Sequence, residues 1–274
     1  MLEYSYHREP TPHICFPQLL PKELYEQITF PEIRQRSMGR SGRDLFMGEP
    51  GFERAVSSVG LRDIYSRFCG SEFVSWVLSI FEQDLVRLRC RTRAESARLV
   101  PYLETREELD LAPDVLDDAA DPSEVFNRFD FSEADSNYTP YVHLDSPRRV
   151  VGGLLFFTDA KGIDGGNFVL YKDRLYLGDR VARWPHPAKT IPPTGNTGVV
   201  FLNANCGFHG PSELRAGTRK WVYYSISSRS RAWEPATSGI ARAAMTKIAG
   251  RTLRRVGIAR LPLEPKSKLD ANRR

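Results

Sequence analysis

The sequence contains no apolar run that approaches the ~20 residues needed to span a bilayer. Its first residues, MLEYSYHREPTPHICF, have neither a basic start followed by an apolar block nor a small-residue cleavage site, so we expect no secretory signal. No CxxC pair occurs, and scattered cysteines in a chain of this size are typical of reduced thiols in a cytoplasmic protein. The four cysteines are Cys15, Cys69, Cys90 and Cys206.

Several common motifs are also missing. There is no P-loop, no GxGxxG and no GxSxG, which excludes the commonest nucleotide-binding and α/β-hydrolase classes. No internal repeat is present either. The 274 residues are 41% hydrophobic, 27% charged and 11% aromatic, which indicates a globular protein with one large domain or a core with substantial appendages.

Positive charge is concentrated at the C-terminal end. Residues 236–274 hold ten Lys and Arg against two acids, whereas residues 1–235 hold 29 basic and 32 acidic side chains. The net charge of +5 therefore belongs to a basic tail on a nearly neutral body, and we expect no nucleic-acid partner. Apolar residues among the basic ones predict an amphipathic helix in this tail. It would either pack on the body or make a peripheral contact with an acidic membrane surface or partner.

The N-terminal part, residues 1–125, is expected to be mostly helical with an acidic connecting segment. Between residues 61 and 88, apolar residues recur at three- and four-residue intervals, which predicts helices with one core face. Residues 34–52 are rich in Gly and Arg and predict a long loop. Residues 104–135 contain twelve acids against two arginines, which predicts either a solvated connection or a mobile lid over a site.

From about residue 138 to residue 228 the sequence changes to short runs rich in Val, Phe, Leu and Tyr, separated by turn residues. Their spacing is that of a β-sandwich or barrel. The runs are YVHLD, VVGGLLFFTD, GNFVLYK, GVVFLNA and KWVYYSIS.

The first of these runs places His143 two positions before Asp145. In a strand, side chains at i and i+2 point to the same face, so the two could share a metal ion that needs a third ligand from elsewhere. His209 is the preferred third ligand because it follows an apolar strand and a glycine. Two imidazoles and one carboxylate form the facial triad of non-haem Fe(II) oxygenases. The histidines considered for the third position are His7, His13, His186 and His209.

Other features follow in a fixed order. Gly165-Gly166-Asn167-Phe168 comes twenty residues after Asp145, and Gly217-Thr218-Arg219 places a glycine eight and an arginine ten residues after His209. With the HxD pair, these features resemble the prolyl-4-hydroxylase-like branch of the 2-oxoglutarate/Fe(II)-dependent dioxygenases. The resemblance covers roughly residues 126–228.

The resemblance implies an α+β fold. A double-stranded β-helix (jelly-roll) catalytic core would occupy residues 126–230, supported by the N-terminal helices. A basic C-terminal helix and tail would follow at residues 231–274.

The resemblance also implies roles for the motif residues. His143, Asp145 and His209 would bind Fe(II), which 2-oxoglutarate would chelate. Arg219 would meet the distal carboxylate of 2-oxoglutarate with two parallel hydrogen bonds. The implied activity is hydroxylation of an unactivated C–H bond in a small-molecule or peptidyl substrate. O2 would be the second cosubstrate, succinate and CO2 the products, and ascorbate a reductant.

A second contact to 2-oxoglutarate is less defined. Tyr223 and Ser225 share the strand face of the arginine by alternation, so either could add a hydroxyl contact to the cosubstrate. Relatives often supply a tyrosine from the strand after HxD, where this chain has Phe156 and Phe157, with Thr158 as a further candidate.

Two other classes of protein stay open from the sequence. One is a cupin-type metalloenzyme that does not use 2-oxoglutarate, and the other is a non-catalytic jelly-roll binding module. The substrate is not specified by any residue. The acidic segment favours a cationic group, whereas the Arg-rich loop favours an anionic one.

Overall fold

The computed structural model describes residues 2–34, 42–105, 108, 119–136, 142–159, 161–175, 183–204 and 207–234. The predicted basic helix and tail lie outside the described residues from position 235 onward. Among the helices that are described, none combines the length and the apolar composition needed to cross a bilayer.

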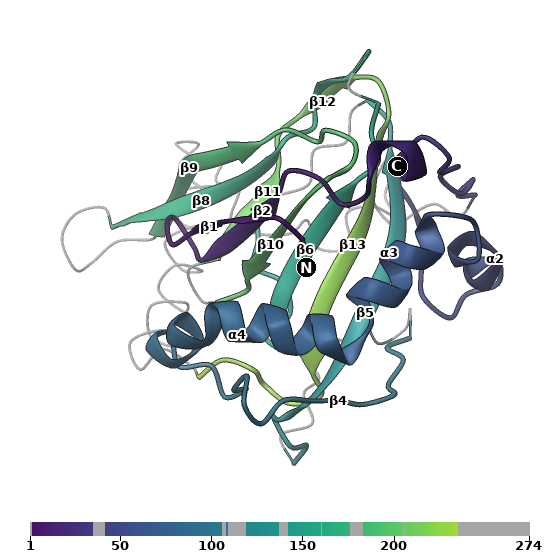
Figure 1. Ribbon diagram of the computed structural model, residues 1–274. Coiled ribbons are helices and arrows are strands. Elements are labelled where there is room, and N and C mark those ends of the chain that lie inside the picture. Colours follow the sequence, from purple (N-terminus) through teal and green to yellow (C-terminus); the bar gives the residue numbers. More distant parts are fainter. Residues whose placement is uncertain are drawn as a thin grey trace, which may run out of the picture.

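The strands of the described chain form two largely antiparallel sheets and a short strand pair (Figure 1). The larger sheet runs in the order β1 (Ser5–His7), β2 (His13–Phe16), β10 (Thr197–Leu202), β6 (Arg149–Phe156), β13 (Arg219–Ser228), β5 (Glu124–Ala134) and β3 (Gly42–Leu45), and β4 (Arg98–Leu99) pairs in parallel with β5. The smaller sheet has the order β11 (His209–Pro211), β8 (Phe168–Leu175) and β9 (Arg183–Ile191). The short pair joins β12 (Leu214–Ala216) to β7 (Asp164–Gly165).

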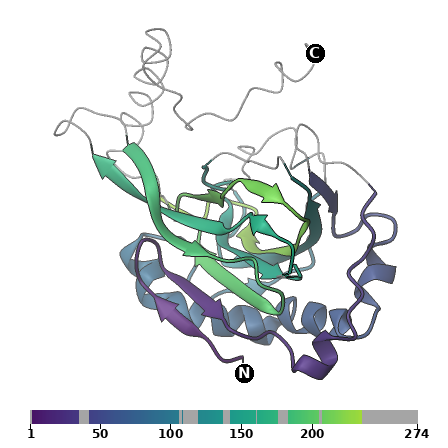
Figure 2. The ribbon, with the colours of Figure 1, turned by 90° about the horizontal axis from the view of Figure 1, so that it is seen from above.

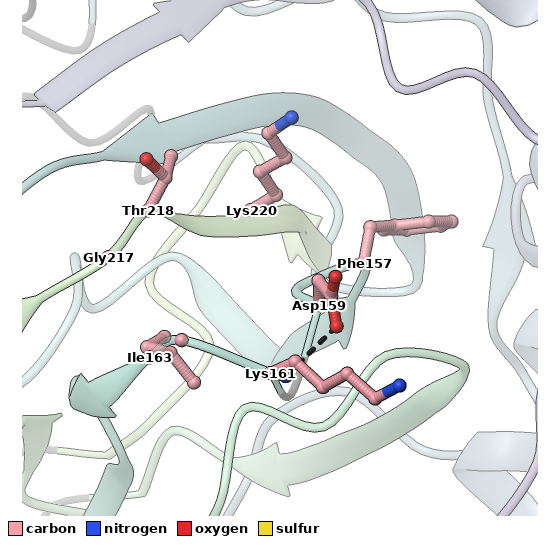
Figure 3. Close-up of a pocket in the computed structure, with 8 residues that line it drawn as sticks. Phe157, Asp159, Lys161, Ile163, Gly217, Thr218 and Lys220 are labelled. Atoms are coloured by element: carbon pink, nitrogen blue, oxygen red, sulfur yellow. Dashed lines mark hydrogen bonds between the residues drawn. The ribbon is translucent and has the colours of Figure 1, made fainter.

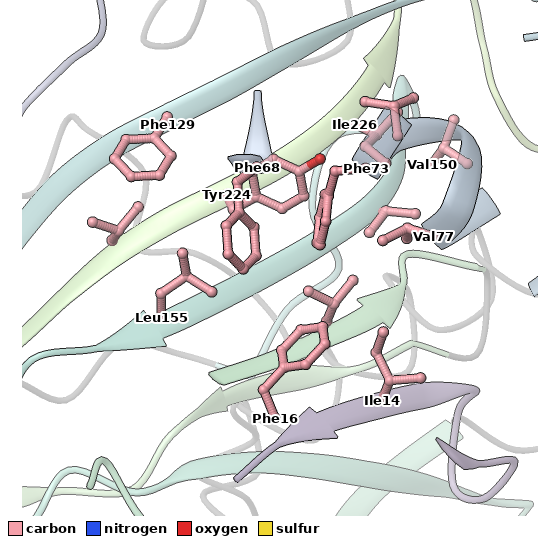
Figure 4. Packing of buried hydrophobic residues seen from close by; sticks show 14 of the residues in the cluster. Ile14, Phe16, Phe68, Phe73, Val77, Phe129, Val150, Leu155, Tyr224 and Ile226 are labelled. Atoms are coloured by element: carbon pink, nitrogen blue, oxygen red, sulfur yellow. The ribbon is translucent and has the colours of Figure 1, made fainter. Parts of the chain in front are cut away.

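The outer face of the larger sheet is covered by helices (Figure 2). They are α1 (Lys22–Tyr25), α2 (Phe52–Val56), α3 (Leu61–Phe68) and α4 (Ser71–Arg87). The periodic apolar stripe predicted between residues 61 and 88 falls in α3 and α4 and faces the sheet. Ring centroids of Phe68 lie 4.3 Å from Phe73 and 5.4 Å from Tyr224 of β13, so aromatic packing joins helices to sheet (Figure 4).

The inner face of the larger sheet meets the smaller sheet across a second apolar cluster. Strand alternation places Phe156 and Trp221 on this inner face, whereas their neighbours Phe157 and Val222 belong to the helix-covered face. Phe168 of β8 packs on Phe201 of β10 with ring centroids 5.2 Å apart. The two facing sheets agree with the jelly-roll architecture that the sequence resemblance implies.

The N-terminal part departs from the mostly helical expectation. Strands β1 and β2 extend one edge of the larger sheet, and β3, within the predicted loop, covers the other. The acidic segment departs as well, because its end is the buried strand β5 and Glu104 is only 7% exposed. The short edge strands add backbone hydrogen-bond partners to the sheet. Segments this short show no periodic sequence pattern from which a strand could be predicted.

Candidate active site

The structure brings together the three predicted ligands His143, Asp145 and His209. The two histidines form an isolated bridge, in which each backbone N–H donates to the other's carbonyl at 2.9 and 3.0 Å. Oδ1 of Asp145 lies 3.4 Å from Nε2 of His143 and 3.7 Å from Nε2 of His209. One ligand atom from each residue lies within 4.8 Å of the others, so the three can meet one metal ion.

Of the predicted strand YVHLD the structure describes residues 142–145. These form one isolated bridge at His143 rather than a strand, so the predicted extent is wrong for them. The side chains of His143 and Asp145 nevertheless lie on the same side, as the i, i+2 spacing predicts. The bridge to His209 holds His143 in register, and the carboxylate two positions later reaches both imidazoles.

His209 is fixed by its surroundings. Its Nδ1 lies 3.0 Å from the carbonyl of Gly207, which can only accept, so Nδ1 carries the proton and Nε2 is the lone-pair nitrogen towards Asp145. The rings of Phe201 and Phe168 lie 4.6 and 5.6 Å from the imidazole. Burial lowers the pKa of His209 to about 4, so the ring is neutral near pH 7, which is the metal-binding form.

Asp145 is held at both its backbone and its side chain. Its N–H donates to Oδ1 of Asn203 at 3.1 Å, and the amide of Asn203 donates in turn to the carbonyl of Ser146 at 3.0 Å. Burial alone would raise the pKa of Asp145, but His209 and His143 outweigh it and hold the pKa well below its usual range. The carboxylate is therefore ionised. Asn203 was not identified from the sequence, although it stands at the end of the apolar run of β10.

Tyr223 and Ser225 both have hydrogen-bond partners within the protein. The hydroxyl of Tyr223 donates to Oδ2 of Asp145 at 3.0 Å, so it contacts a predicted metal ligand. Burial, reinforced by Asp145, raises the pKa of Tyr223 well above its usual range and keeps the hydroxyl protonated. The buried hydroxyl of Ser225 lies 3.3 Å from that of Ser227, to which Arg149 donates at 2.8 Å.

Arg219 lies on the same inner face at the start of β13. It is 2% exposed, and its guanidinium carbon stands 4.5 Å from the ring centroid of Trp221 and 5.5 Å from that of Phe156. Arg219 precedes Tyr223 by four positions, which places their Cα atoms about 13 Å apart along the strand. Of the two phenylalanines considered for a second anchor, Phe156 therefore lies beside the guanidinium of Arg219, and Phe157 belongs to the helix-covered face. Thr158 instead bonds through its hydroxyl to the backbone of Lys220.

The glycines of both motifs have steric reasons to be glycine. Gly217 has φ 83°, and a Cβ there would lie 2.4 Å from the carbonyl oxygen of Gly162. A Cβ at Gly165 would lie 2.0 Å from the carbonyl oxygen of Glu213, and one at Gly166 would lie 3.1 Å from Cδ1 of Leu214. The Gly-Gly pair, with φ 84° and 66°, therefore allows β12 and the residue before it to pack closely.

A buried ion cluster next to the triad was missed by sequence reasoning. Glu104 accepts from Arg128 at 3.0 Å, from Arg148 at 2.8 Å and from Arg149. Burial opposes ionisation of this glutamate, but Arg149, Arg128 and Arg148 outweigh it and hold the pKa below its usual value. Glu104 lies in the segment that predicted either a solvated connection or a mobile lid. No local pattern marks the three arginines as its partners.

A surface pocket opens beside the start of β13 (Figure 3). Phe157, Asp159, Lys161 and Lys220 contribute to its lining together with the loop around Gly217. Lys220 alternates with Arg219 along the strand, so this pocket opens on the helix-covered side of the sheet and is separate from the triad.

No protein-family model matches the sequence, and no curated protein matches it. Among solved structures, the chain is similar to an oxidoreductase of the 2OG-Fe(II) oxygenase family from Burkholderia pseudomallei, with 15% identity over 84% of this chain and 74% of that chain, at a TM-score of 0.37. It is also similar to a Pseudomonas putida prolyl-4-hydroxylase, with 15% identity over 80% and 93% of the two chains, at a TM-score of 0.37.

A third similar structure is a prolyl hydroxylase from Trichoplax adhaerens, solved in complex with a peptide fragment of a hypoxia inducible factor oxygen degradation domain. It has 11% identity over 86% of each chain, at a TM-score of 0.43. At these identities the chemistry of this chain is argued from its own side chains.

Proposed function

We propose that this protein is an Fe(II)- and 2-oxoglutarate-dependent dioxygenase that hydroxylates an unactivated C–H bond. The observation that carries the proposal is the convergence of His143, Asp145 and His209, with one ligand atom of each within 4.8 Å. Two imidazoles and one carboxylate are the donor set of non-haem Fe(II) oxygenases, so these residues fit the metal. The motif order, ending in Gly-x-Arg after the distal histidine, supports 2-oxoglutarate as the cosubstrate.

Each residue has a distinct task in this proposal. Nε2 of both histidines and the Asp145 carboxylate hold the metal, and the carboxylate lowers the net charge of the centre. Tyr223 keeps Asp145 oriented through its 3.0 Å hydrogen bond. Arg219, buried among Trp221 and other apolar side chains, supplies the fixed cation for the distal carboxylate of 2-oxoglutarate.

The bound iron would supply O2 activation, with 2-oxoglutarate as the reductant and succinate and CO2 as products. The protein positions the groups and limits water around them, as the apolar rings of Phe168 and Phe201 do beside His209. A small molecule or a peptide would be the substrate, and ascorbate could serve as an accessory reductant.

The test is an anaerobic titration of the apoprotein with Fe(II) and 2-oxoglutarate, followed by the visible metal-to-ligand charge-transfer band. We expect a band in the wild type that is lost in His209→Ala and needs much more 2-oxoglutarate in Arg219→Ala. Arg215→Ala is the matched control, because Arg215 is exposed and pairs with Asp164. A wild type without the band at saturating ligand would exclude the proposal and favour a cupin-type enzyme or a binding module.

Substrate turnover is a separate measurement. A wild type that shows the band should release succinate from 2-oxoglutarate when candidate small molecules and peptides are supplied. Succinate that rises with one substrate, and not in His209→Ala, would identify the substrate class.

A further inference from the structure

A second group of metal-binding side chains lies on the N-terminal hairpin. His7, His13 and Cys15 place one ligand atom each within 4.8 Å of one another. They are far in sequence from the triad and come from β1 and β2 at the edge of the larger sheet. None of them has a part in the proposed dioxygenase chemistry.

Strand register explains why these three meet. His7 pairs directly with His13 across the hairpin, and Cys15 stands two residues further on the same face, opposite Ser5. The two imidazoles stack with centroids 4.9 Å apart and an interplanar angle of 17°. Nε2 of His7 lies 3.1 Å from the hydroxyl of Ser5, so the ring is directed along the hairpin towards the cysteine end.

His13 provides an independent observation that points to a ligand. Its side chain is fully buried, and Nδ1 lies 2.8 Å from the carbonyl of Thr11, so Nδ1 carries the proton. Nε2, the lone-pair nitrogen, is buried and has no hydrogen-bond partner in the described part of the chain. A buried acceptor without a partner is costly, and a metal ion would satisfy it. Burial also lowers the pKa of His13 to about 4, which keeps the ring neutral.

We propose that His7, His13 and Cys15 form a second metal site, distinct from the triad, that binds a zinc-class divalent ion through two imidazoles and one thiolate. Thiolate and imidazole together favour Zn²⁺ over the hard cations Mg²⁺ and Ca²⁺. Binding replaces the thiol proton of Cys15, which passes to solvent, with a metal–sulfur bond. Burial raises the pKa of that thiol and Lys189 offsets the rise only in part, so the free thiol is protonated and the metal has to displace its proton.

Three protein ligands leave one position of a tetrahedral ion for water or for Ser5, which stands on the same face. The site would join β1, an edge strand of only three residues, to β2. Its role is therefore structural: the ion fastens β1 to β2.

The experiment uses Co²⁺, because a cobalt–thiolate bond gives a near-ultraviolet charge-transfer band that the triad, having no sulfur, cannot produce. The full-length apoprotein is titrated anaerobically with Co²⁺ while bound metal is counted by equilibrium dialysis. We expect two ions per chain and a thiolate band in the wild type. Cys15→Ser should lose the band and one ion, and excess Zn²⁺ should abolish the band in the wild type.

Controls separate this site from the triad and from other thiols. His209→Ala should keep the thiolate band while it loses the other ion, and Cys69→Ser should resemble the wild type. His7→Gln, at a partly exposed position, serves as a second variant if Cys15→Ser fails to fold, and it should weaken the band. A single ion per chain without a thiolate band, or a band that persists in Cys15→Ser, would overturn the site and leave the dioxygenase proposal untouched.

Discussion

The hydroxyl of Tyr223 donates a 3.0 Å hydrogen bond to Oδ2 of Asp145, a residue 78 positions earlier in the chain. The other carboxylate oxygen, Oδ1, faces the two imidazoles of the candidate metal site. One oxygen is therefore available to a metal while the other is fixed by the protein, which is how neighbouring groups orient a carboxylate ligand.

Tyr223→Phe removes this hydrogen bond and keeps the ring. We expect Fe(II) affinity to fall by about tenfold to a hundredfold, the range typical of residues that orient metal ligands. Because the arginine anchor is unchanged, 2-oxoglutarate should still saturate the iron-loaded variant. Fe(II) titration in the presence of saturating 2-oxoglutarate measures the effect. Tyr224→Phe is the control, since its hydroxyl faces Asn127 on the other side of the sheet. Equal Fe(II) affinity in both variants would contradict the role given to Tyr223.

Arg219→Ala should act on the cosubstrate rather than on the metal. The loss of charge-assisted hydrogen bonds predicts a rise of roughly a hundredfold in the KM for 2-oxoglutarate. Arg219→Lys should recover only part of this, because an ammonium cannot reproduce two parallel hydrogen bonds. Fe(II) binding without 2-oxoglutarate should stay close to wild type. An unchanged KM would show that another group holds the distal carboxylate.

The convergence of His143, Asp145 and His209 was predictable because its signals are local or sequential. His143 and Asp145 show the i, i+2 pattern, and the distal histidine is followed by a glycine and an arginine at fixed spacing. The contact between Tyr223 and Asp145 was not predictable, because it depends on how separate strands and loops meet in space. Strand alternation predicted that Tyr223 and Arg219 share a face, whereas a contact of Tyr223 with the cosubstrate stays a prediction.

The fold also has parts that the sequence predicts and parts that it does not. Helices α3 and α4 were predicted because their apolar residues repeat at the helical period over more than two turns. Strands β1 and β3 were missed because three or four residues at a sheet edge carry no measurable period. Glu104 was assigned to a solvated or mobile segment, whereas its burial is determined by Arg128, Arg148 and Arg149, which reach it from later parts of the chain.

The buried Glu104 should make the folding stability depend on pH. Its folded pKa is below the unfolded value, so its stabilising contribution is present above about pH 4.5 and is lost as pH falls through the folded pKa. Glu104→Gln removes the charge that Arg128, Arg148 and Arg149 share, although Arg128 keeps its ion pair with Asp130. The substitution should lower the free energy of unfolding at pH 7 by about 3–5 kcal/mol.

Urea denaturation at a series of pH values tests this prediction. The difference between wild type and Glu104→Gln should shrink steadily below pH 4.5. Glu124→Gln is the control, since Glu124 pairs with Arg98 in a largely exposed ion pair, which contributes about 0–1 kcal/mol. A pH-independent difference at Glu104 would mean that shape rather than charge is responsible.

Two variants separate the effect of the close contact at Gly217 from the effect of its positive φ. Gly162→Ala and Gly217→Ala both place a Cβ at φ above 80°, which costs about 1–3 kcal/mol of folding stability. At Gly162 nothing lies within 4 Å of the added carbon, whereas at Gly217 it meets a carbonyl oxygen at 2.4 Å. Gly217→Ala should therefore show the larger fall in Tm, and because it displaces the start of β13 it should also raise the KM for 2-oxoglutarate. Equal changes in Tm and KM for the two variants would show that backbone strain alone requires glycine here, with no contribution from the close approach that positions Arg219.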